Sequence, residues 1–380
     1  MDPISAATHF NPYDVHYPRL RARGGLTFDA TLGLWVASSA TAVAAVLNHP
    51  ACRVRPLHEP VPRAIVRRPA GQLFARLMRM NDGPRHRCPR AAIEAGLGQL
   101  VASDLMPTLA NWRPALVAPL RAADLRRWQF ALPVALVAGL LGVPTEQRED
   151  LARRTGEWVA CFSPLSNESQ LLAADQATQH LSAQLQAVLA APEHSPLLSD
   201  ILRRSGDLDP QDLLANLVGL LAQTHDACAG LIGNSLIALL ADPALCQHLR
   251  QTPAALAPWL LQRQRLDPPV QNTRRFVAEP CTLNGIELQA GDCVLVLLAA
   301  ANHDPALAAV TGAAATPPDF SFGAGVHRCP GQGLAQNIVG ALLQALLRTS
   351  DLSRLPLRWC YQPSVNGRIP LFEDSLEAGQ

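Results

Sequence analysis

The segment from Pro210 to Leu240 constrains the fold of this 380-residue chain more than any other. It is apolar on nearly every face and is interrupted by one polar patch, QTHD at residues 223–226. A helix that is apolar all round has no face suited to water, so other elements must surround it. The segment therefore predicts a central helix in a large, mainly helical domain, with polar side chains held inside the core.

The rest of the chain predicts further helices with a small amount of β-structure. Apolar residues recur at helical spacing from about Pro89 to Leu261, with breaks at proline and glycine. Shorter segments give weaker signals: helices at Ala42–Leu47 and Gly333–Leu347, a surface loop at 50–72, a hairpin at 26–36, a hairpin at Thr282–Ile286, a strand at Val294–Leu298, and strands at Leu357–Phe372.

No internal repeat and no domain boundary is visible in this pattern. We expect a single, mainly α domain with small β-sheets over residues 1–380. It would comprise a mixed α/β N-terminal part at about 1–60, a helical core at about 89–262 and a functional loop at 322–331.

All 32 basic residues are arginine, because the chain contains no lysine. Enzymes that form a Schiff base through lysine are therefore excluded, as are P-loop and kinase-type nucleotide sites. A formal net charge of +1 without a basic tract argues against nucleic acid as a partner. What remains is chemistry that needs no lysine.

The compartment can be inferred from the N-terminus and the cysteines. Residues Met1–Leu20 are polar and lack the apolar stretch of a secretory signal. No run approaches the roughly 18 apolar residues of a transmembrane helix. The nine cysteines form no CxxC pair, which favours reduced thiols over a disulfide framework or a zinc ribbon. We therefore expect a cytoplasmic protein without a membrane segment.

The most informative segment is FGAGVHRCPG at residues 322–331. Glycines on both sides of Cys329 let the backbone pass close to a flat group and turn backbone N–H groups toward the sulfur. Such hydrogen bonds stabilise a thiolate and tune a metal bound to it. The dipole of the helix expected just after Cys329 acts in the same direction. Cys329 is therefore the candidate metal ligand.

This segment resembles the heme-binding loop of the cytochrome P450 family, in which a cysteine thiolate is the axial iron ligand. The resemblance implies that Cys329 binds the iron of heme b and that Phe322 packs beside the sulfur. Gly323 and Gly331 are the glycines of the same motif, and His327 is expected to reach a heme propionate.

Two further segments resemble the propionate-binding elements of the family. His86-x-x-x-Arg90 places two cations on one face of a helix, where both can meet the same carboxylate pair. The segment Asp267-Pro-Pro-Val270, followed by Arg275, resembles the strand whose arginine pairs with the other propionate.

The resemblance also extends to the pocket and the connecting segments. It implies that Ala227, Val270 and Asn272 line the substrate pocket. Ala299–Pro305 is similar to a structural signature of the family. The chain between Pro305 and Phe322 is shorter than is usual, in a region that helps to receive a redox partner.

The polar patch of the central helix differs from the family pattern. Asp226 matches the distal acid, but Ala227 replaces the alcohol that helps deliver protons to bound dioxygen. Gln223 and Thr224 occupy positions that are usually small, and Cys228 lies one helical turn after Thr224. We take Asp226, with Thr224, Gln223 and Cys228, as the candidate catalytic residues.

Three interpretations of this patch stay open. In the first, the missing alcohol is drift, and a substrate hydroxyl or ordered water replaces it. In the second, the chemistry is altered to peroxide use, nitrogen-oxide chemistry, dehydration or coupling. In the third, the chain is a heme-binding or sensor protein with little turnover. His225 is either a proton relay or a histidine turned away from the pocket.

Two further groups of residues, near Arg265 and in the loop at 63–68, also raise open questions. Gln262-x-x-Arg265 stands where the family carries Glu-x-x-Arg, so Arg265 has at best a neutral partner there, which is costly for a buried cation. Arg63, Arg67 and Arg68 lie in the loop that caps the pocket in this family. They either solvate the loop or favour an acidic or carrier-bound substrate.

The resemblance implies a heme-thiolate monooxygenase of bacterial type that oxidises a small apolar or natural-product substrate with dioxygen. Because no dinucleotide loop is present, electrons are expected from a ferredoxin and a ferredoxin reductase, unless peroxide serves instead. We expect a monomer that binds neither nucleic acid nor a membrane.

Overall fold

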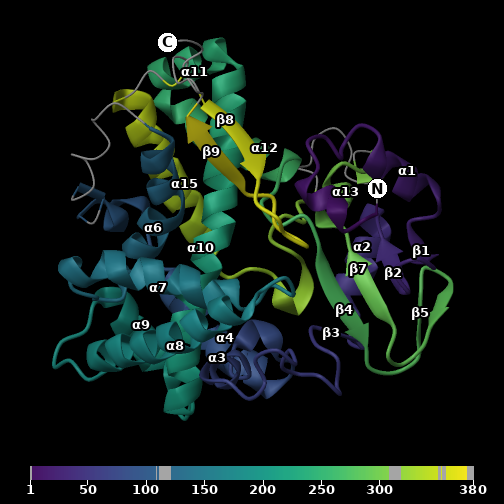
Figure 1. Cartoon of the computed structure of the whole chain (residues 1–380), viewed down its shortest axis with the longest axis horizontal. Coiled ribbons are helices and arrows are strands. Elements are labelled where there is room, and N and C mark those ends of the chain that lie inside the picture. Colours follow the sequence, from purple (N-terminus) through teal and green to yellow (C-terminus); the bar gives the residue numbers. More distant parts are fainter. Residues whose placement is uncertain are drawn as a thin grey trace.

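The computed structural model describes residues 2–107, 109–110, 121–307, 318–349, 352 and 357–374. The long helix α10 (Pro210–Ala241) runs through the helical part of the molecule (Figure 1). Asp209 caps it by accepting a hydrogen bond from the Gln211 amide, and Pro210 lies in the first turn, where no N–H is needed. Residues on all sides of α10 are buried, which confirms the predicted central helix.

Other helices surround α10 and share one apolar core with it. The helices that contact it are α4 (Pro84–Leu97), α6 (Ala122–Leu140), α7 (Arg148–Ala160), α8 (Glu168–Leu189), α11 (Pro243–Gln251), α12 (Leu256–Leu266) and α15 (Gln332–Thr349). The helix predicted at Gly333–Leu347 is thus confirmed as α15. Within the described residues no single helix is both long and apolar enough to cross a membrane; α10 and α11 meet that test of length and composition only together, across a 109° bend.

Shorter helices complete the fold. Two of them pack on the helical part, α3 (Pro69–Phe74) against α8 and α9 (Pro196–Ser205) against α4. Three lie next to the sheet (Figure 1): α1 (His16–Ala22), α2 (Ala40–Asn48) and α13 (Leu298–Asn302). The 3-10 turns are η1 (Ser5–Thr8), η2 (Met78–Met80), η3 (Ala102–Leu105), η4 (Thr145–Gln147), η5 (Pro253–Ala255) and η6 (Gly325–His327).

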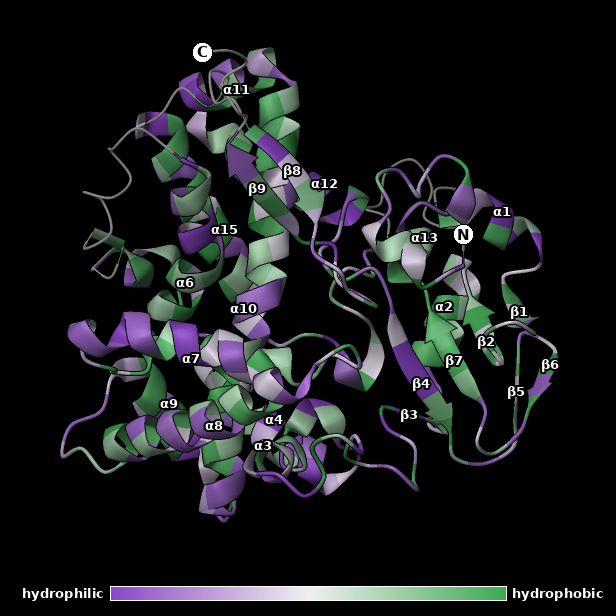
Figure 2. Ribbon diagram, viewed as in Figure 1, coloured by the Kyte–Doolittle hydropathy of each residue, from purple (hydrophilic) through white to green (hydrophobic). Residues whose placement is uncertain are grey.

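A five-stranded sheet lies beside the helices, with strand order β1-β2-β7-β4-β3 (Figure 1). Its strands are β1 (Leu26–Asp29), β2 (Leu34–Ala37), β3 (Cys52–Arg53), β4 (Thr273–Val277) and β7 (Cys293–Val296). β2 and β7 are parallel, and the other pairs are antiparallel. Figure 2 shows the central strand β7 as mostly hydrophobic, whereas β4 carries hydrophilic residues. The sheet joins the N-terminal part of the chain to residues 273–296.

The remaining strands form two hairpin-like pairs. β5 (Cys281–Leu283) and β6 (Ile286–Leu288) are joined by Asn284 and Gly285, whose φ angles of 50° and 77° suit a type I′ turn. β8 (Leu357–Tyr361) pairs with β9 (Pro370–Asp374). The hairpins predicted at 26–36 and Thr282–Ile286 and the strands at Leu357–Phe372 are confirmed, while the strand predicted at Val294–Leu298 ends at Val296 because α13 begins at Leu298.

The prediction of a surface loop at residues 50–72 is wrong in part. Residues 52–53 form β3, and Ile65 is fully buried. α3 begins within the segment, and Ala70, Leu73 and Phe74 bury one face of it. This short apolar stripe at helical spacing outweighs the proline-rich and arginine-rich composition of the segment. Most of the chain predicted to be shortened, between Pro305 and Phe322, lies outside the described residues.

Arg265 has a different partner from the one expected. Gln262 is exposed and does not bond to it. Instead Arg265 Nη2 donates to the main-chain oxygen of Asn302 at 2.9 Å, and Asn302 Nδ2 donates back to the Arg265 oxygen at 3.0 Å. The side chain of Arg265 is only partly buried, which reduces the cost of lacking a carboxylate partner.

A buried arginine connects the two ends of the chain. Arg368 donates to Asp267 Oδ1 at 2.7 Å, to the main-chain oxygen of Phe10 at 2.9 Å and to that of His9. Asp267 also accepts a hydrogen bond from the Tyr13 hydroxyl at 2.5 Å. The N-terminal segment is therefore fixed against the segment that precedes β9.

Candidate active site

The loop that carries Cys329 depends on glycine at two positions. Gly323 and Gly325 have φ angles of 69° and 67°, a left-handed region that residues with a side chain avoid. At Gly325 a Cβ atom would lie 2.7 Å from the main-chain oxygen of Leu47, so the close approach of α2 also needs glycine. The Cys329 amide donates to the Phe322 carbonyl at 2.9 Å, which closes the loop and fixes the cysteine.

The Cys329 thiol experiences opposing electrostatic effects. Burial raises its pKa above the usual range, whereas the Gly331 N–H and the charges of Arg90 and Arg328 oppose that rise. A Cβ atom at Gly331 would be in ordinary van der Waals contact with Cys329 Sγ, at 3.8 Å, so the Gly331 backbone lies close to the sulfur. An amide donor and nearby cations around a partly buried sulfur are the environment of a metal-binding thiolate.

A cavity of about 670 Å³ lies between the Cys329 loop and α10. Ligand pockets span about 300–1,000 Å³, so this cavity has the size of a binding site. The predicted site residues that line it are Gln223, Thr224, Asp226, Ala227, Cys228, Val270, Asn272, Arg275, Phe322, Gly323, His327, Cys329 and Gly331. His86 and Arg90 do not line it. The fold thus brings α10, the segment after α12 and the cysteine loop to one cavity.

Cationic groups gather at one edge of this cavity. His327 Nε2 lies 2.9 Å from Asp82 Oδ1, and the centroid of the His86 ring lies 4.1 Å from that of His327. Arg275 is buried and forms no ion pair with a described residue. Burial lowers the pKa of Arg275, and the charge of Asp82 opposes this change. One carboxylate therefore faces one arginine and two histidines at this edge.

His86 and Arg90 share α4 but differ in surroundings. Arg90 Nε donates to Glu94 Oε2 at 3.1 Å, whereas His86 is buried against His327. Burial, with the charges of His327 and Arg90, lowers the pKa of His86 to about 4. Although the two residues are four positions apart on one helix, their side chains do not contact the same carboxylate of the protein. His86 is neutral at pH 7 unless an anion lies beside it.

The polar patch of α10 presents one carboxylate to the cavity. Gln223 Nε2 and Thr224 Oγ1 each donate to the main-chain oxygen four residues earlier, at 3.0 Å and 2.8 Å. Their donors are therefore used within the helix. Asp226 Oδ1 lies 2.7 Å from His225 Nδ1, and its second oxygen has no hydrogen-bond partner among the described residues.

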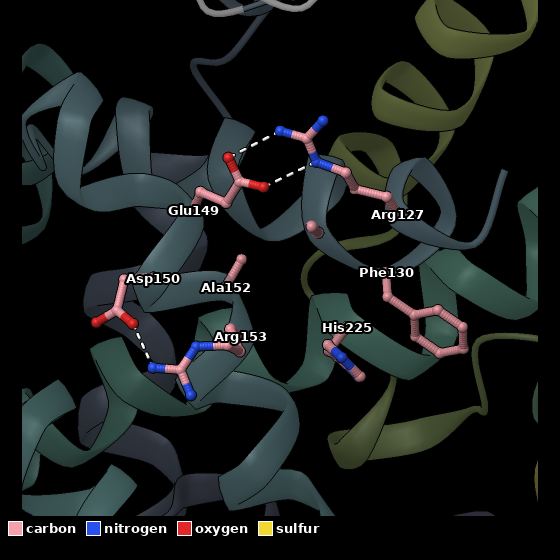
Figure 3. Close-up of a pocket in the computed structure, with 8 residues that line it drawn as sticks. Arg127, Phe130, Glu149, Asp150, Ala152, Arg153 and His225 are labelled. Carbon is pink, nitrogen blue, oxygen red and sulfur yellow. Dashed lines mark hydrogen bonds and ion pairs between the residues drawn. The ribbon is translucent and has the colours of Figure 1, made fainter. Parts of the chain in front are cut away.

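A second pocket, of about 500 Å³, is lined by His225 and by residues of α6 and α7 (Figure 3). Its rim is solvent-exposed and carries two ion pairs, Arg127 with Glu149 and Arg153 with Asp150. His225 packs against Phe130, with ring centroids 5.1 Å apart. His225 lines both this pocket and the larger cavity. Consecutive helical residues point about 100° apart, so His225 can face outward while Asp226 faces the cavity.

Sequence reasoning missed Arg79, and the structure favours one of the two interpretations of three other arginines. Arg79 lines the cavity, but no motif surrounds it in the sequence. The arginines at 63, 67 and 68 do not line the cavity. Arg63 pairs with Glu59, Arg67 is exposed, and Arg68 pairs with two acids of α8.

These residues fit the heme that the family resemblance implies. The thiols of Cys329 and Cys228, on opposite walls, lie near enough to interact electrostatically, and burial raises the pKa of Cys228 to about 12. Leu231 and Ile338 contribute apolar surface to the walls. A flat apolar ring with carboxylates at one edge matches a thiol on one wall and the basic side chains of Arg275 and His327 at the rim.

Comparisons with known proteins give one consistent result. No family model matches the chain. The chain is 31% identical over 278 residues to the Vitamin D(3) 25-hydroxylase of Pseudonocardia autotrophica, which covers 68% of this chain and 67% of that protein. It is 28% identical over 247 residues to the biotin biosynthesis cytochrome P450 of Bacillus subtilis, or 62% of each chain. It is 27% identical over 379 residues to the 20-oxo-5-O-mycaminosyltylactone 23-monooxygenase of Streptomyces fradiae, covering 94% of this chain and 88% of that protein.

Solved structures match over nearly the whole chain. P450BioI, in complex with an acyl carrier protein ligated to hexadec-9Z-enoic acid, has a TM-score of 0.76 at 23% identity and covers 95% of this chain and 96% of its own. P450 RauA, complexed with a biosynthetic intermediate of aurachin RE, has a TM-score of 0.77 at 18% identity and covers 98% of this chain and 96% of its own. The sequence relatives and the shared mainly helical fold agree with the cysteine loop and its cavity. The chain therefore belongs to the cytochrome P450 family of monooxygenases.

Proposed function

We propose that the chain binds heme b through Cys329 and oxidises a small, largely apolar natural product with dioxygen and externally supplied electrons. The observation that carries this proposal is the Cys329 thiol, which a glycine loop presents to a cavity of about 670 Å³. A thiolate-bound heme supplies the activation of dioxygen. The residues of the chain bind and orient the substrate and supply protons. We also propose that the sheet and the helices form one domain, because residues of both line the cavity.

Cationic residues would hold the heme carboxylates at the rim. Arg275 and His327 line the cavity there, and His86 lies directly behind His327. Asp82 now accepts from His327, so it would share that histidine with a heme carboxylate. The charge of Arg90 acts both on the sulfur of Cys329 and on His86. Phe322, Gly323 and Gly331 shape the surroundings of the sulfur.

Asp226 would deliver protons, with His225 as its source. Water in the outer pocket can reach the His225 ring, and His225 Nδ1 lies 2.7 Å from Asp226 Oδ1. A proton taken up at Nε2 can be matched by release of the Nδ1 proton to Asp226. After the carboxyl group rotates, Asp226 releases this proton toward the cavity. Gln223, Thr224 and Cys228 shape the wall around it.

A second candidate function is peroxide-dependent oxidation at the same site. Ala227 has no hydroxyl, and the Thr224 hydroxyl is bonded to its own helix. Peroxide brings its own oxygen, electrons and protons, so it reduces the need for a distal alcohol. The same cavity and the same thiolate would serve both reactions.

A ferredoxin would supply electrons to the face around Arg328. Arg328 is exposed beside Val326, and the exposed Arg85 and Arg87 flank His86 on the neighbouring helix. Exposed cations around one apolar residue suit an acidic electron carrier. We expect Arg328→Ala to slow reduction several-fold at low salt and much less at high salt, measured by stopped-flow spectroscopy. A rate independent of salt would count against an acidic carrier.

The proposed function is tested with the heme-loaded chain. The carbon monoxide difference spectrum of the reduced protein should show thiolate-ligated heme. Product analysis then compares a ferredoxin and reductase system with hydrogen peroxide alone on a panel of apolar natural products. Products only with the electron-transfer system support the monooxygenase, products with peroxide alone support the second candidate, and a spectrum without thiolate ligation rejects both.

A further inference from the structure

Arg79 is a cation in the cavity that pairs with no acid among the described residues. It lies in η2, between α3 and α4, and lines the larger cavity. Its Nε atom is shielded from solvent and has no hydrogen-bond partner. Arg79 forms no ion pair and no hydrogen bond with any residue that the structure describes. A partly buried guanidinium whose Nε–H has no hydrogen-bond partner is costly, so its presence calls for an explanation.

An aromatic wall holds the Arg79 guanidinium in place. Its central carbon lies 5.3 Å from the centroid of the Phe162 ring, which is cation–π distance. Phe162 is itself fixed edge-on between Trp158 and Phe74, with centroid distances of 4.9 Å and 5.5 Å. The guanidinium therefore has a defined position but leaves its donors unused.

The carboxylate that faces Arg79 is already engaged. Asp226 is the acid whose charge acts on Arg79, but the two side chains lie beyond ion-pair distance. Asp226 Oδ1 instead bonds to His225 at 2.7 Å. Burial lowers the pKa of Arg79, and the charge of Asp226 only partly opposes this change. Asp226 therefore compensates the charge of Arg79 only in part, and no acid among the described residues pairs with it.

Arg55 is an arginine of the same cavity whose guanidinium has hydrogen-bond partners. It also lines the cavity and lies over an aromatic ring, that of Phe74, at 5.8 Å. Unlike Arg79, it donates to the main-chain oxygens of Glu59 at 2.8 Å and Pro60 at 3.3 Å. The lack of a partner at Arg79 is therefore a property of that position and not of arginine in this cavity.

Arg79 is also separate from the cations assigned to the heme carboxylates. The acid that acts on Arg275 is Asp82, which also accepts from His327. The acid that acts on Arg79 is Asp226, on α10. Arg79 therefore has a different acidic neighbour from Arg275 and His327.

We propose that Arg79 binds a free carboxylate of the substrate, so that the enzyme acts on an acid with an apolar body. The inference rests on the proposed function only in taking this cavity as the substrate site. The planar fork of a guanidinium matches the two oxygens of a carboxylate. Val159, Phe162 and Leu231 supply apolar surface in the same cavity. An acid anchored at Arg79 extends its apolar part along these residues.

The test compares acids with neutral molecules of the same shape. Binding of decanoate and 5-phenylpentanoate, each against its primary amide, is measured by calorimetry on the heme-loaded chain, without turnover. We expect the acids to bind more tightly than the amides, and Arg79→Gln to weaken acid binding by about 10- to 100-fold while amide binding stays within about twofold. Arg55→Gln, the matched control, should leave the preference for acids intact.

Several outcomes overturn the inference. It fails if the wild-type chain binds neither acid more tightly than its amide, if Arg79→Gln weakens acid and amide equally, or if Arg55→Gln has the same effect as Arg79→Gln. The carbon monoxide spectrum and product analysis test the proposed function separately. A chain that binds acids through Arg79 but yields no product would keep this inference and reject that function.

Discussion

The two walls of the cavity, the Cys329 loop and the polar patch of α10, are built in different ways. The loop needs special backbone conformations, with Gly323 and Gly325 at positive φ and a hydrogen bond from Cys329 to Phe322. The patch lies on a regular helix, whose backbone accepts almost any side chain. The loop therefore restricts its sequence, whereas the patch can exchange residues without changing the fold.

This difference follows from what each wall does. A metal ligand must be one particular atom at one place, so Cys329 has no substitute on its wall. A proton can come from any acid, imidazole or water within hydrogen-bond reach, so Ala227 can replace an alcohol if Asp226 and His225 supply the proton together. If the two walls differ in this way, substitutions in the Cys329 loop and substitutions in the polar patch should have different consequences.

The largest effect is expected at Cys329. Cys329→Ser should abolish the thiolate signature of the carbon monoxide spectrum and all oxidation, because a hydroxyl does not replace the thiolate ligand. Cys228→Ser on the opposite wall is the matched control and should keep that signature. If Cys329→Ser kept an unchanged spectrum, the assignment of the two walls would be wrong.

Asp226→Asn should lower turnover by about 10²-fold, because it removes the proton carrier of the α10 wall while preserving size. Thr224→Val should stay close to wild type, since its hydroxyl is already bonded to the helix. Both variants should show the wild-type carbon monoxide spectrum, which separates proton supply from ligation. Steady-state product formation provides the measurement, and equal losses in the two variants would contradict the role of Asp226.

Gly325→Ala tests the backbone requirement of the loop. We expect a loss of about 1–3 kcal/mol in the free energy of unfolding, because alanine would keep a positive φ and contact the Leu47 carbonyl. Gly333→Ala is the control, because a Cβ there meets no atom within 4 Å. It should change stability by less than about 1 kcal/mol. Urea denaturation measures both, and similar values would show that the loop tolerates side chains.

Gly156→Ala tests the position of His225 while keeping both His225 and Asp226, which bond to each other. A Cβ at Gly156 would lie 2.9 Å from His225 Nε2, so the ring must shift. We expect turnover to fall by less than about tenfold and the solvent isotope effect to rise, because proton transfer becomes slower relative to other steps. His225→Asn should remove the effect of Gly156→Ala. Additive losses in the double variant would mean that Gly156 acts elsewhere.

The two walls also explain what the sequence could predict. The central helix and the Cys329 loop were predictable because both depend on residues near one another in the chain. Arg79 was not, because its lack of a partner depends on Phe162 and Asp226, which folding brings close from other segments. The part played by His225 was likewise undecided, since a helix pattern does not show that a second pocket lies behind the ring.

The smallest expected effect concerns the uptake of protons by His86 when heme binds. In the chain without an anion, burial and nearby charges lower the pKa of His86 to about 4, so this ring is neutral at pH 7. A heme carboxylate beside it would raise that pKa, so heme binding takes up a fraction of a proton at His86. Through His86, the affinity of the chain for heme should therefore increase as the pH falls from neutrality toward about 4. Calorimetry of heme binding in buffers of different ionisation enthalpy should show less proton uptake for His86→Asn than for wild type. Equal uptake would place the heme carboxylates away from His86, and only Arg275 and His327 would remain to hold them.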